Sequence, residues 1–399
     1  MNRGAVSALA HAGAVAVVFV ASGASRAEDF VSVRGVYYRE PSTRVLQPMV
    51  EVQRDSDAGL DIGAHFLIDA ITSASASAGG SDTAFTETRN EVGLHVGKRW
   101  SRFQVSGAYK YSAESDYWSH GLGLSGLARL WGDTATVRLS LGRSFDSLTS
   151  RGRPPNCRVA PGTSCSLDTW FASVGYTQVL SPVVIAQLGY DIAYLDGFQG
   201  NLYRTVAGTS EVLPYRSGGS LRDGRRLRNA ISPRIAYYVP PSGTGFQLAY
   251  RYYWDSFPGT PVTPYDPWGI TAHTFELRIY QELGAYLEIR FLYRHHIQDH
   301  GAAFWCDTVA SAGCYPAGSP YFSSDPKLGP VHTKYPELKL VISGAIARSV
   351  PFLRWFSAGS FEVSYGTYFQ DTSFGRKLMP MPWYCPDTCL VQLGYRMPY

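Results

Sequence analysis

The stretch that decides the fold is Val391-Gln-Leu393-Gly-Tyr395-Arg-Met397-Pro-Tyr399. Apolar residues occupy every second position in it, and its last residue is aromatic. Side chains of a β-strand alternate between its two faces, so a period of two predicts a strand with one apolar face. The rest of the chain decides whether such faces meet a protein core or lipid.

The first residues have the composition of a secretory signal peptide. Arg3 supplies a positive charge, Ala12 to Val20 form a short apolar run, and Ser25-Arg26-Ala27 offers a cleavage site. The apolar run is too short to span a bilayer as a helix. We therefore predict a signal peptide over 1–27 and a mature chain over 28–399. The alternative is an N-terminal membrane anchor.

The composition of the mature chain favours one large barrel over two soluble domains. The sequence of 399 residues contains 27 Tyr, 19 Phe, 9 Trp and 40 Gly, and no later apolar stretch has the length of a transmembrane helix. Backbone groups inside lipid must be satisfied internally, which leaves only helices or a closed barrel. The formal net charge of +4 gives no argument for nucleic acid binding.

Sixteen segments after the signal peptide alternate between apolar and polar residues. A soluble β-sandwich alternates too. Here, however, the polar faces carry glycine, serine and paired charges, and the apolar faces end in Tyr and Trp. That pattern is typical of a membrane barrel with a polar lumen and aromatic girdles. The predicted strands are 31–39, 44–54, 60–72, 85–98, 102–115, 118–131, 134–147, 168–180, 183–196, 228–239, 245–256, 270–282, 285–299, 332–346, 358–372 and 390–399.

The connections favour an up-and-down order. The connections after the even-numbered segments are mostly short, and most of the others are long, which matches the periplasmic turns and external loops of outer-membrane barrels. We predict an all-β, transmembrane, antiparallel up-and-down barrel of about 16 strands. Fourteen strands is the fallback, because the first two segments have the weakest pattern.

The C-terminal strand resembles the assembly signal of outer-membrane β-barrel proteins. The residues that carry this resemblance are Val391, Leu393, Tyr395, Met397 and Tyr399. It implies a location in the bacterial outer membrane after secretion to the periplasm. It also implies the barrel-assembly machinery, outer-membrane lipid and lipopolysaccharide as partners.

The six cysteines fall outside the predicted strands, two in each of three long loops. Six cysteines allow fifteen pairings. Loop tips lie far apart, so local partners are favoured, and the periplasm permits disulfides to form. A metal site would need several clustered ligands, and no histidines lie close to these cysteines. The predicted disulfides are Cys157 with Cys165, Cys306 with Cys314, and Cys385 with Cys389.

A ladder of charges is predicted to face the lumen. If residues 282–284 form the hairpin turn, Arg278 faces Glu288 and Glu276 faces Arg290. The charges would either set the ion preference of a polar pore or close the lumen of a rigid barrel. The ladder consists of Arg251, Glu276, Arg278, Glu288, Arg290, Arg294 and Lys339.

Two other motifs have ordinary explanations. Gly121-x-Gly123-x-x-Gly126 fits a dinucleotide fingerprint, but it lies inside a predicted strand, where small residues open space. In a strand, His296 and His300 would lie about 13 Å apart, too far to hold one ion. We therefore predict no metal, no cofactor and no nucleic acid partner.

A third motif, the basic cluster from Arg222 to Arg228, could pair with lipid-A phosphates or be a solvated loop end.

Two segments resemble a known family. They are Arg34-Gly-Val-Tyr-Tyr-Arg-Glu-Pro-Ser-Thr-Arg-Val-Leu-Gln-Pro48 and Asp69-Ala-Ile-Thr-Ser-Ala-Ser-Ala-Ser-Ala78, the latter followed by Thr86-Glu-Thr-Arg-Asn-Glu-Val-Gly93. They are similar to the bacterial family known as domain of unknown function 3570. The resemblance implies an envelope barrel and brings no catalytic residue.

The function expected from these observations is a porin-like channel for small polar solutes, not an enzyme. The alternatives are a structural or docking barrel with periplasmic or lipoprotein partners, and a hydrolase with its site at the barrel rim. Turnover that is lost on changing His296 or Asp299 would favour the hydrolase.

Overall fold

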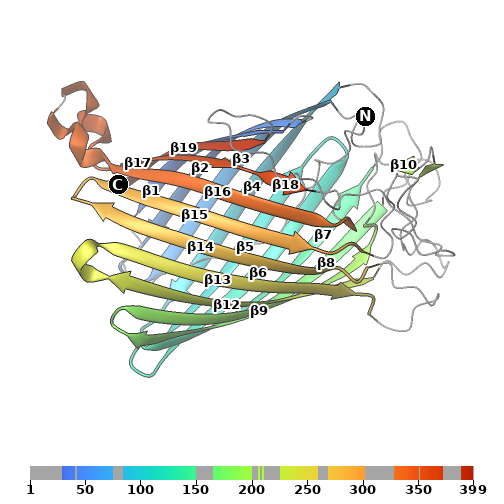
Figure 1. Cartoon of the computed structure of the whole chain (residues 1–399), viewed down its shortest axis with the longest axis horizontal. Helices are drawn as coiled ribbons and strands as arrows, with labels where there is room; N and C mark the ends of the chain where they lie inside the picture. Colours follow the sequence, from blue (N-terminus) through green and yellow to red (C-terminus); the bar gives the residue numbers. More distant parts are fainter. Residues whose placement is uncertain are drawn as a thin grey trace.

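The structure is a computed structural model of a closed antiparallel β-barrel (Figure 1). It describes residues 29–40, 43–74, 84–149, 165–199, 205–206, 209–210, 225–258, 268–301, 328–349, 351–371 and 388–398. The predicted signal peptide and Tyr399 lie outside these residues, as do Cys157, Cys306, Cys314 and Cys385.

The strands follow one another along the chain with one small hairpin inserted. They are β1 (Phe30–Arg39), β2 (Thr43–Asp55), β3 (Leu60–Ala74), β4 (Ala84–Arg99), β5 (Phe103–Ala113), β6 (Tyr117–Leu130), β7 (Ala135–Leu148), β8 (Cys165–Ser181), β9 (Val184–Gly197), the hairpin strands β10 (Thr205–Val206) and β11 (Thr209–Ser210), β12 (Arg226–Val239), β13 (Thr244–Ser256), β14 (Thr271–Leu283), β15 (Leu287–Gln298), β16 (Val331–Ser343), β17 (Ser360–Thr367), β18 (Phe369–Asp371) and β19 (Cys389–Pro398).

Each barrel strand pairs with its neighbours in sequence, and β19 returns to pair with β1. The closure is complete over ten consecutive pairs, from Phe30 opposite Pro398 to Arg39 opposite Cys389. Because β17 and β18 both follow β16 and are interrupted only at Tyr368, they act as one barrel strand. The described residues therefore form a barrel of sixteen strands, which confirms the predicted count and includes the two weak N-terminal strands.

The outer face of the wall is apolar. Val33, Phe66, Leu94, Leu124 and Leu248 all expose more than a third of their surface, although they are large apolar residues. Residues between them in sequence point the other way, because side chains alternate across a strand. An apolar exterior around a polar interior is the arrangement that lipid requires of a membrane barrel.

Outward-facing aromatic side chains gather toward both ends of the wall. Toward the end with the short turns they include Trp100, Phe103, Trp131, Tyr237 and Tyr286, and toward the other end Tyr37, Phe145, Trp170 and Tyr365. Tyr and Trp prefer the boundary between hydrocarbon and headgroups, so these two belts mark the membrane surfaces.

The two ends of the barrel differ. At one end β2–β3, β4–β5, β6–β7, β8–β9, β12–β13 and β14–β15 are joined by short turns, and β1 begins and β19 ends there. Most of the connections at the other end are long. The exception at the short-turn end is the connection of β16 to β17, which holds the 3-10 helices η4 (Gly344–Ser349) and η5 (Pro351–Phe356) and projects beyond the wall in Figure 1. Short turns face the periplasm in outer-membrane barrels.

The described part of the chain contains no helix long and apolar enough to cross a membrane.

The positions of the cysteines correct one expectation. Cys165 is the first residue of β8 and Cys389 the first residue of β19, so the statement that no cysteine lies in a strand is wrong. Both are fully buried and disulfide-bonded. Since the other four cysteines lie outside the described residues, the three local pairings remain a prediction. In the predicted pairings, Cys165 and Cys389 would each tie a loop to the end of a strand.

Candidate functional site in the barrel lumen

The seven residues of the predicted ladder all lie on inward-facing positions of four neighbouring strands. Arg251 is on β13, Glu276 and Arg278 on β14, Glu288, Arg290 and Arg294 on β15, and Lys339 on β16. Their neighbours Leu248, Phe275 and Leu338 are exposed on the outer face, which fixes the direction of the ladder. The topology therefore brings these charges together on one side of the lumen.

The partners within the ladder differ from the expected ones. The turn between β14 and β15 is Gly284 to Tyr286, so Leu283 pairs with Leu287 and Glu276 lies opposite Arg294. The expected facing of Arg278 with Glu288 and of Glu276 with Arg290 is therefore wrong. The register is shifted by four residues, an even number, so every side chain stays on its predicted face.

The actual ion pairs form a shared network. Glu276 accepts hydrogen bonds from Arg278 on its own strand at 2.7 Å and from Arg294 on β15 at 3.0 Å. Arg290 donates to Glu288 two residues away at 2.8 Å, and Lys339 donates to Glu362 on β17 at 2.6 Å. These pairs tie the long side chains to neighbouring positions of the same wall.

Three arginines of the same wall have no such carboxylate. Arg228 and Arg234 on β12 and Arg251 on β13 point inward, and no described carboxylate lies within ion-pair distance of them. Arg251 lies over the ring of Tyr253 at 5.4 Å. These guanidinium groups form a positive line along the wall without an ion pair, although Asp255 is near enough to attract Arg228 and Asp191 is near enough to attract Arg251.

The opposite wall has the opposite sign. β3 and β13 are eight positions apart in the sixteen-strand order, so they lie diametrically across the barrel. The described inward-facing residues of β2–β4 include six carboxylates and two arginines, while those of β12–β15 include seven arginines and four carboxylates. The acidic residues are Glu51, Asp55, Asp61, Asp69, Glu87 and Glu91. The lumen therefore carries a field directed from one wall to the other.

Sequence reasoning missed two histidines of the acidic wall. His65 on β3 contacts Glu91 at 3.2 Å, and His95 on β4 contacts Asp61. The ring of each lies where a Cβ of the glycine opposite would stand, His65 over Gly93 and His95 over Gly63. A signal was present, because Gly-x-His occurs at 63–65 and again at 93–95.

On a third part of the wall, formed by β6–β9, glycines occupy inward-facing positions. Gly123, Gly142, Gly175 and Gly189 face inward there, one on each strand. At Gly123 and Gly175 an added Cβ would meet nothing nearer than 3.8 Å. The Gly121-x-Gly123-x-x-Gly126 stretch thus lies within β6, a strand, and not at the start of a helix. Because these four inward positions carry no side chain, this part of the wall projects less into the lumen than the charge ladder does.

A buried carboxylate organises the loop end of the basic wall. Asp255 has no exposed side-chain surface and accepts hydrogen bonds from Arg226 Nε at 2.8 Å, Tyr253 at 2.9 Å and the backbone N–H of Ile270 at 2.7 Å. Trp268 packs beside it with Arg226 over its ring at 4.4 Å. We call Asp255 and these partners the rim hub.

The rim hub corrects the interpretation of the basic cluster. Arg226 and Arg228 point into the lumen and not toward the lipid face, so these two residues of the cluster are not placed to meet lipid-A phosphates. Arg226 has its counterion inside the protein. The pairing of β12 with β13 sets this contact, since Arg228 lies opposite Asp255 and Arg226 is two residues further along on the same face.

The histidines near 296 are divided between the two faces. His296 faces the lumen and bonds Thr274 at 2.8 Å, whereas His295 faces outward and contacts His332 at 2.6 Å. Asp299 accepts a hydrogen bond from Thr271 at 2.7 Å. No group of three or more His, Cys, Asp or Glu side chains in the described ranges is placed to hold a metal ion.

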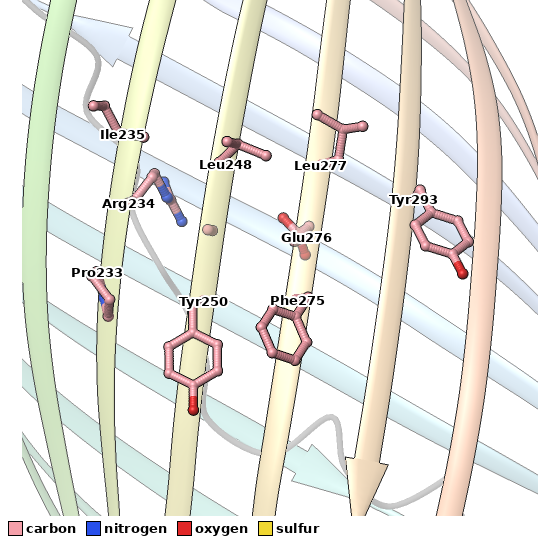
Figure 2. Close-up of a pocket in the computed structure, with 10 residues that line it drawn as sticks. Pro233, Arg234, Ile235, Leu248, Tyr250, Phe275, Glu276, Leu277 and Tyr293 are labelled. Atoms are coloured by element: carbon pink, nitrogen blue, oxygen red, sulfur yellow. The ribbon is translucent and has the colours of Figure 1, made fainter.

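One hollow lies on the outer face of the wall (Figure 2). It measures about 400 Å³ and is lined mainly by apolar side chains of β12–β15, among them Ile235, Leu248, Phe275 and Tyr293. Because these side chains are on the lipid-facing side, the hollow belongs to the membrane surface and not to a path for polar solutes.

Comparisons with known proteins agree with this fold. The family described as "Protein of unknown function (DUF3570)" matches residues 72–346. No curated protein matches the chain.

Among solved structures, CdiB from Acinetobacter baumannii is 8% identical with a TM-score of 0.49, covering 93% of this chain, which spans only 60% of CdiB. A bacterial polysaccharide outer membrane secretin is 10% identical with a TM-score of 0.47, covering 94% of this chain and 100% of that one. OprD from Pseudomonas aeruginosa is 10% identical with a TM-score of 0.41, covering 93% and 94%. At such values the likeness carries no argument about solutes.

Proposed function

The chain belongs to the DUF3570 family of proteins of unknown function, and from that premise we propose that it forms a water-filled channel for small polar solutes with a preference for anions. The observation that carries the proposal is the solvent exposure of the ladder. Arg278, Arg290 and Arg294 face inward, yet 36%, 37% and 40% of their side-chain surfaces are accessible. Charged groups that face a lumen and remain hydrated favour a wet pore.

The size of the barrel supports the same proposal. Small barrels fill their interior with side chains, whereas barrels of sixteen strands leave room for an aqueous channel. The glycines of β6–β9 widen that room on one side. Rings of charged side chains in such a channel set ion preference.

The anion preference follows from the arginines that lack a carboxylate. Arg228, Arg234 and Arg251 form a positive line on the wall of β12 and β13. A unit charge about 4 Å from an ion in water contributes about 1 kcal/mol, roughly a fivefold change in local occupancy. The acidic residues across the lumen are partly neutralised by Arg89, Arg99 and Lys110, which reduces the negative charge that opposes this positive line.

The location and partners are part of the proposal. The barrel resembles outer-membrane proteins. A signal peptide over 1–27, export to the periplasm and insertion by the barrel-assembly machinery would bring it there. Outer-membrane lipid and lipopolysaccharide would then surround the apolar face. A transport role, without catalysis, fits the open arrangement of the lumen charges.

Single-channel conductance of the purified protein in planar bilayers tests the proposal. We expect stable open steps in the wild type. Under a salt gradient, the reversal potential should show that anions are more permeant than cations. Arg251→Gln together with Arg234→Gln should move that potential toward cations. Lys334→Gln is the matched control, because Lys334 lies on the outer face of β16 and its loss leaves the lumen unchanged.

A folded barrel that shows no conductance would contradict the channel proposal. Periplasmic or lipoprotein partners that co-purify with such a closed barrel would support a docking role. Turnover of phospholipid or peptide that is lost in His296→Ala or Asp299→Asn would support a hydrolase at the rim.

A further inference from the structure

The connection from β16 to β17 is unlike the other turns at its end of the barrel. It runs from Gly344 to Gly359 and contains η4 and η5, whereas the neighbouring connection between β14 and β15 is only Gly284 to Tyr286. Figure 1 shows it as a coiled projection next to the C-terminal end of β19. We call the described residues of this connection, 344–349 and 351–359, the foot.

The foot has a fixed base. The N–H of Gly344 donates to the carbonyl of Gly359 at 2.7 Å, which closes the segment at its neck. A Cβ at Gly344 would stand 2.1 Å from the carbonyl oxygen of Phe356, and one at Gly359 2.3 Å from that of Arg396. Only glycine allows these backbone approaches, so the neck is built to hold the foot in one place.

The foot leans toward the lipid side of the wall and not over the lumen. The ring of Phe356 packs edge-on against Tyr395 at 5.4 Å and lies 5.9 Å from Phe361. Phe361 is on the same face of β17 as the exposed Val363, and Tyr395 is on the same face of β19 as the exposed Leu393. This contact joins the foot to the outer aromatic belt.

The surface that the foot presents is apolar and cationic. Trp355 is 82% exposed and Ile346 is 59% exposed, although both are large and apolar. Arg348 and Arg354 are exposed beside them, and the sequence from 344 to 359 contains no Asp or Glu. Trp with arginine and no acid is the composition that favours the headgroup region of a membrane with anionic lipid.

We propose that the foot is a binding site for anionic phospholipid headgroups in the leaflet at the short-turn end of the barrel. Trp355 and Ile346 enter the boundary between headgroups and acyl chains, and Arg348 and Arg354 pair with the phosphates. A periplasmic protein is the other conceivable occupant. The contact of Phe356 with two lipid-facing aromatic residues favours lipid, because it holds the foot at the membrane surface and not in the aqueous space beneath the lumen.

Difference fluorescence between the wild type and Trp355→Phe isolates the emission of Trp355 in the folded barrel. The protein is reconstituted into vesicles of phosphatidylcholine, or of phosphatidylcholine mixed with phosphatidylglycerol, with brominated acyl chains as quenchers. We expect Trp355 to be quenched, and more strongly when the brominated lipid is phosphatidylglycerol. Trp131→Phe provides the reference, since Trp131 is an exposed aromatic of another turn at the same end.

The arginines are tested by the lipids that the purified barrel retains. Each basic side chain near an anionic surface contributes about 1 kcal/mol, so the ratio of retained phosphatidylglycerol to phosphatidylcholine should fall roughly fivefold for each of Arg348→Gln and Arg354→Gln. Arg102→Gln, in the turn between β4 and β5, removes one basic residue elsewhere at the same end and should lower the ratio less than either foot variant does. All variants must retain the heat-modifiable migration of a folded barrel.

Two results would overturn the inference. Emission of Trp355 that no brominated lipid quenches would place the foot in water. A lipid ratio that is unchanged in both arginine variants would show that the foot does not select anionic headgroups. Both outcomes are independent of conductance, so the proposal stands or falls apart from the channel function.

Discussion

Glu276 and Arg294 lie directly opposite each other on β14 and β15, with the carboxylate and the guanidinium 2.9 Å apart. The same carboxylate also accepts a hydrogen bond from Arg278, so one negative charge restrains two arginines. Its own side chain is only 12% exposed, while those of the arginines remain hydrated. Glu276 therefore limits how much positive charge the wall offers to a passing solute.

Removing that carboxylate should raise the anion preference. In Glu276→Gln, Arg278 and Arg294 lose their counterion but remain hydrated. We therefore expect the ratio of anion to cation permeability, measured from the reversal potential, to rise by up to roughly fivefold. Glu282→Gln makes the same change of charge at the edge of the short turn and should shift it much less. An unchanged potential in Glu276→Gln would contradict the role of the pair.

The inward-facing glycines of β6–β9 should control the width of the pore. Gly123→Phe and Gly175→Phe place bulky side chains into the lumen at positions where nothing lies within 3.8 Å of the added Cβ. We expect a lower conductance with little change of ion selectivity, because no charge is altered. Gly126→Phe is the control, since Gly126 faces outward on β6 and has open space around it. Equal conductance in all three variants would refute this role of the glycines.

The rim hub should contribute strongly to stability. Asp255→Asn leaves the buried guanidinium of Arg226 without a counterion, and loss of one partner of a buried ion pair costs about 3–5 kcal/mol. Denaturant unfolding of the refolded barrel in detergent measures the change. Asp299→Asn, which alters only an exposed hydrogen bond to Thr271, should cost about 0.5 kcal/mol or less.

The short loop between β5 and β6 should make stability depend on pH. Burial raises the pKa of Glu114 from 4.5 to about 7, Arg89 lowers it, and Asp116 and Glu87 raise it further. The folded protein therefore holds a proton that the unfolded chain releases between these two values. Stability should fall as the pH rises from about 4.5 to about 7 and then level off.

Melting curves of the folded barrel over this pH range provide the measurement. Glu114→Gln removes the titrating group, so its melting temperature should be less sensitive to pH in the same window. A wild type and variant with parallel pH profiles would show that Glu114 does not titrate there.

The faces of the strands could be predicted from the sequence, and the partners across them could not. The alternation of Phe246, Leu248 and Tyr250 with Gln247, Ala249 and Arg251 fixes which residues meet lipid, whatever the register. The pairing of Glu276 with Arg294 depends on where the turn begins. The turn is 284–286 and not the predicted 282–284. Every predicted pair is therefore wrong by four residues, but each side chain stays on its predicted face.

Contacts made by residues outside the strands were also beyond the sequence. Arg226 meets Asp255 through the pairing of β12 with β13, but the donors from Gly269 and Ile270 lie just before β14, outside that pairing. The foot was expected to be strand up to residue 346 and again from 358, but β16 ends at Ser343 and β17 begins at Ser360. The alternation of Ala345 and Ile346 with their neighbours does not reveal the close neck at Gly344 and Gly359.

Pro233 interrupts the pairing of β12 with β13, and this affects how the barrel responds to a pulling force. β12 and β13 are paired from Leu227 to Ile231 and from Arg234 to Val239, and the ladder between them is interrupted at Ser232 and Pro233. Proline has no N–H to donate, and the outer hollow lies over this gap. The closure of β1 on β19 has no such gap. The ladder between β2 and β3 is interrupted in the same way at Gln47 and Pro48. Under a pulling force the wall should therefore open first at one of these two proline gaps, while the seam between β1 and β19 stays paired.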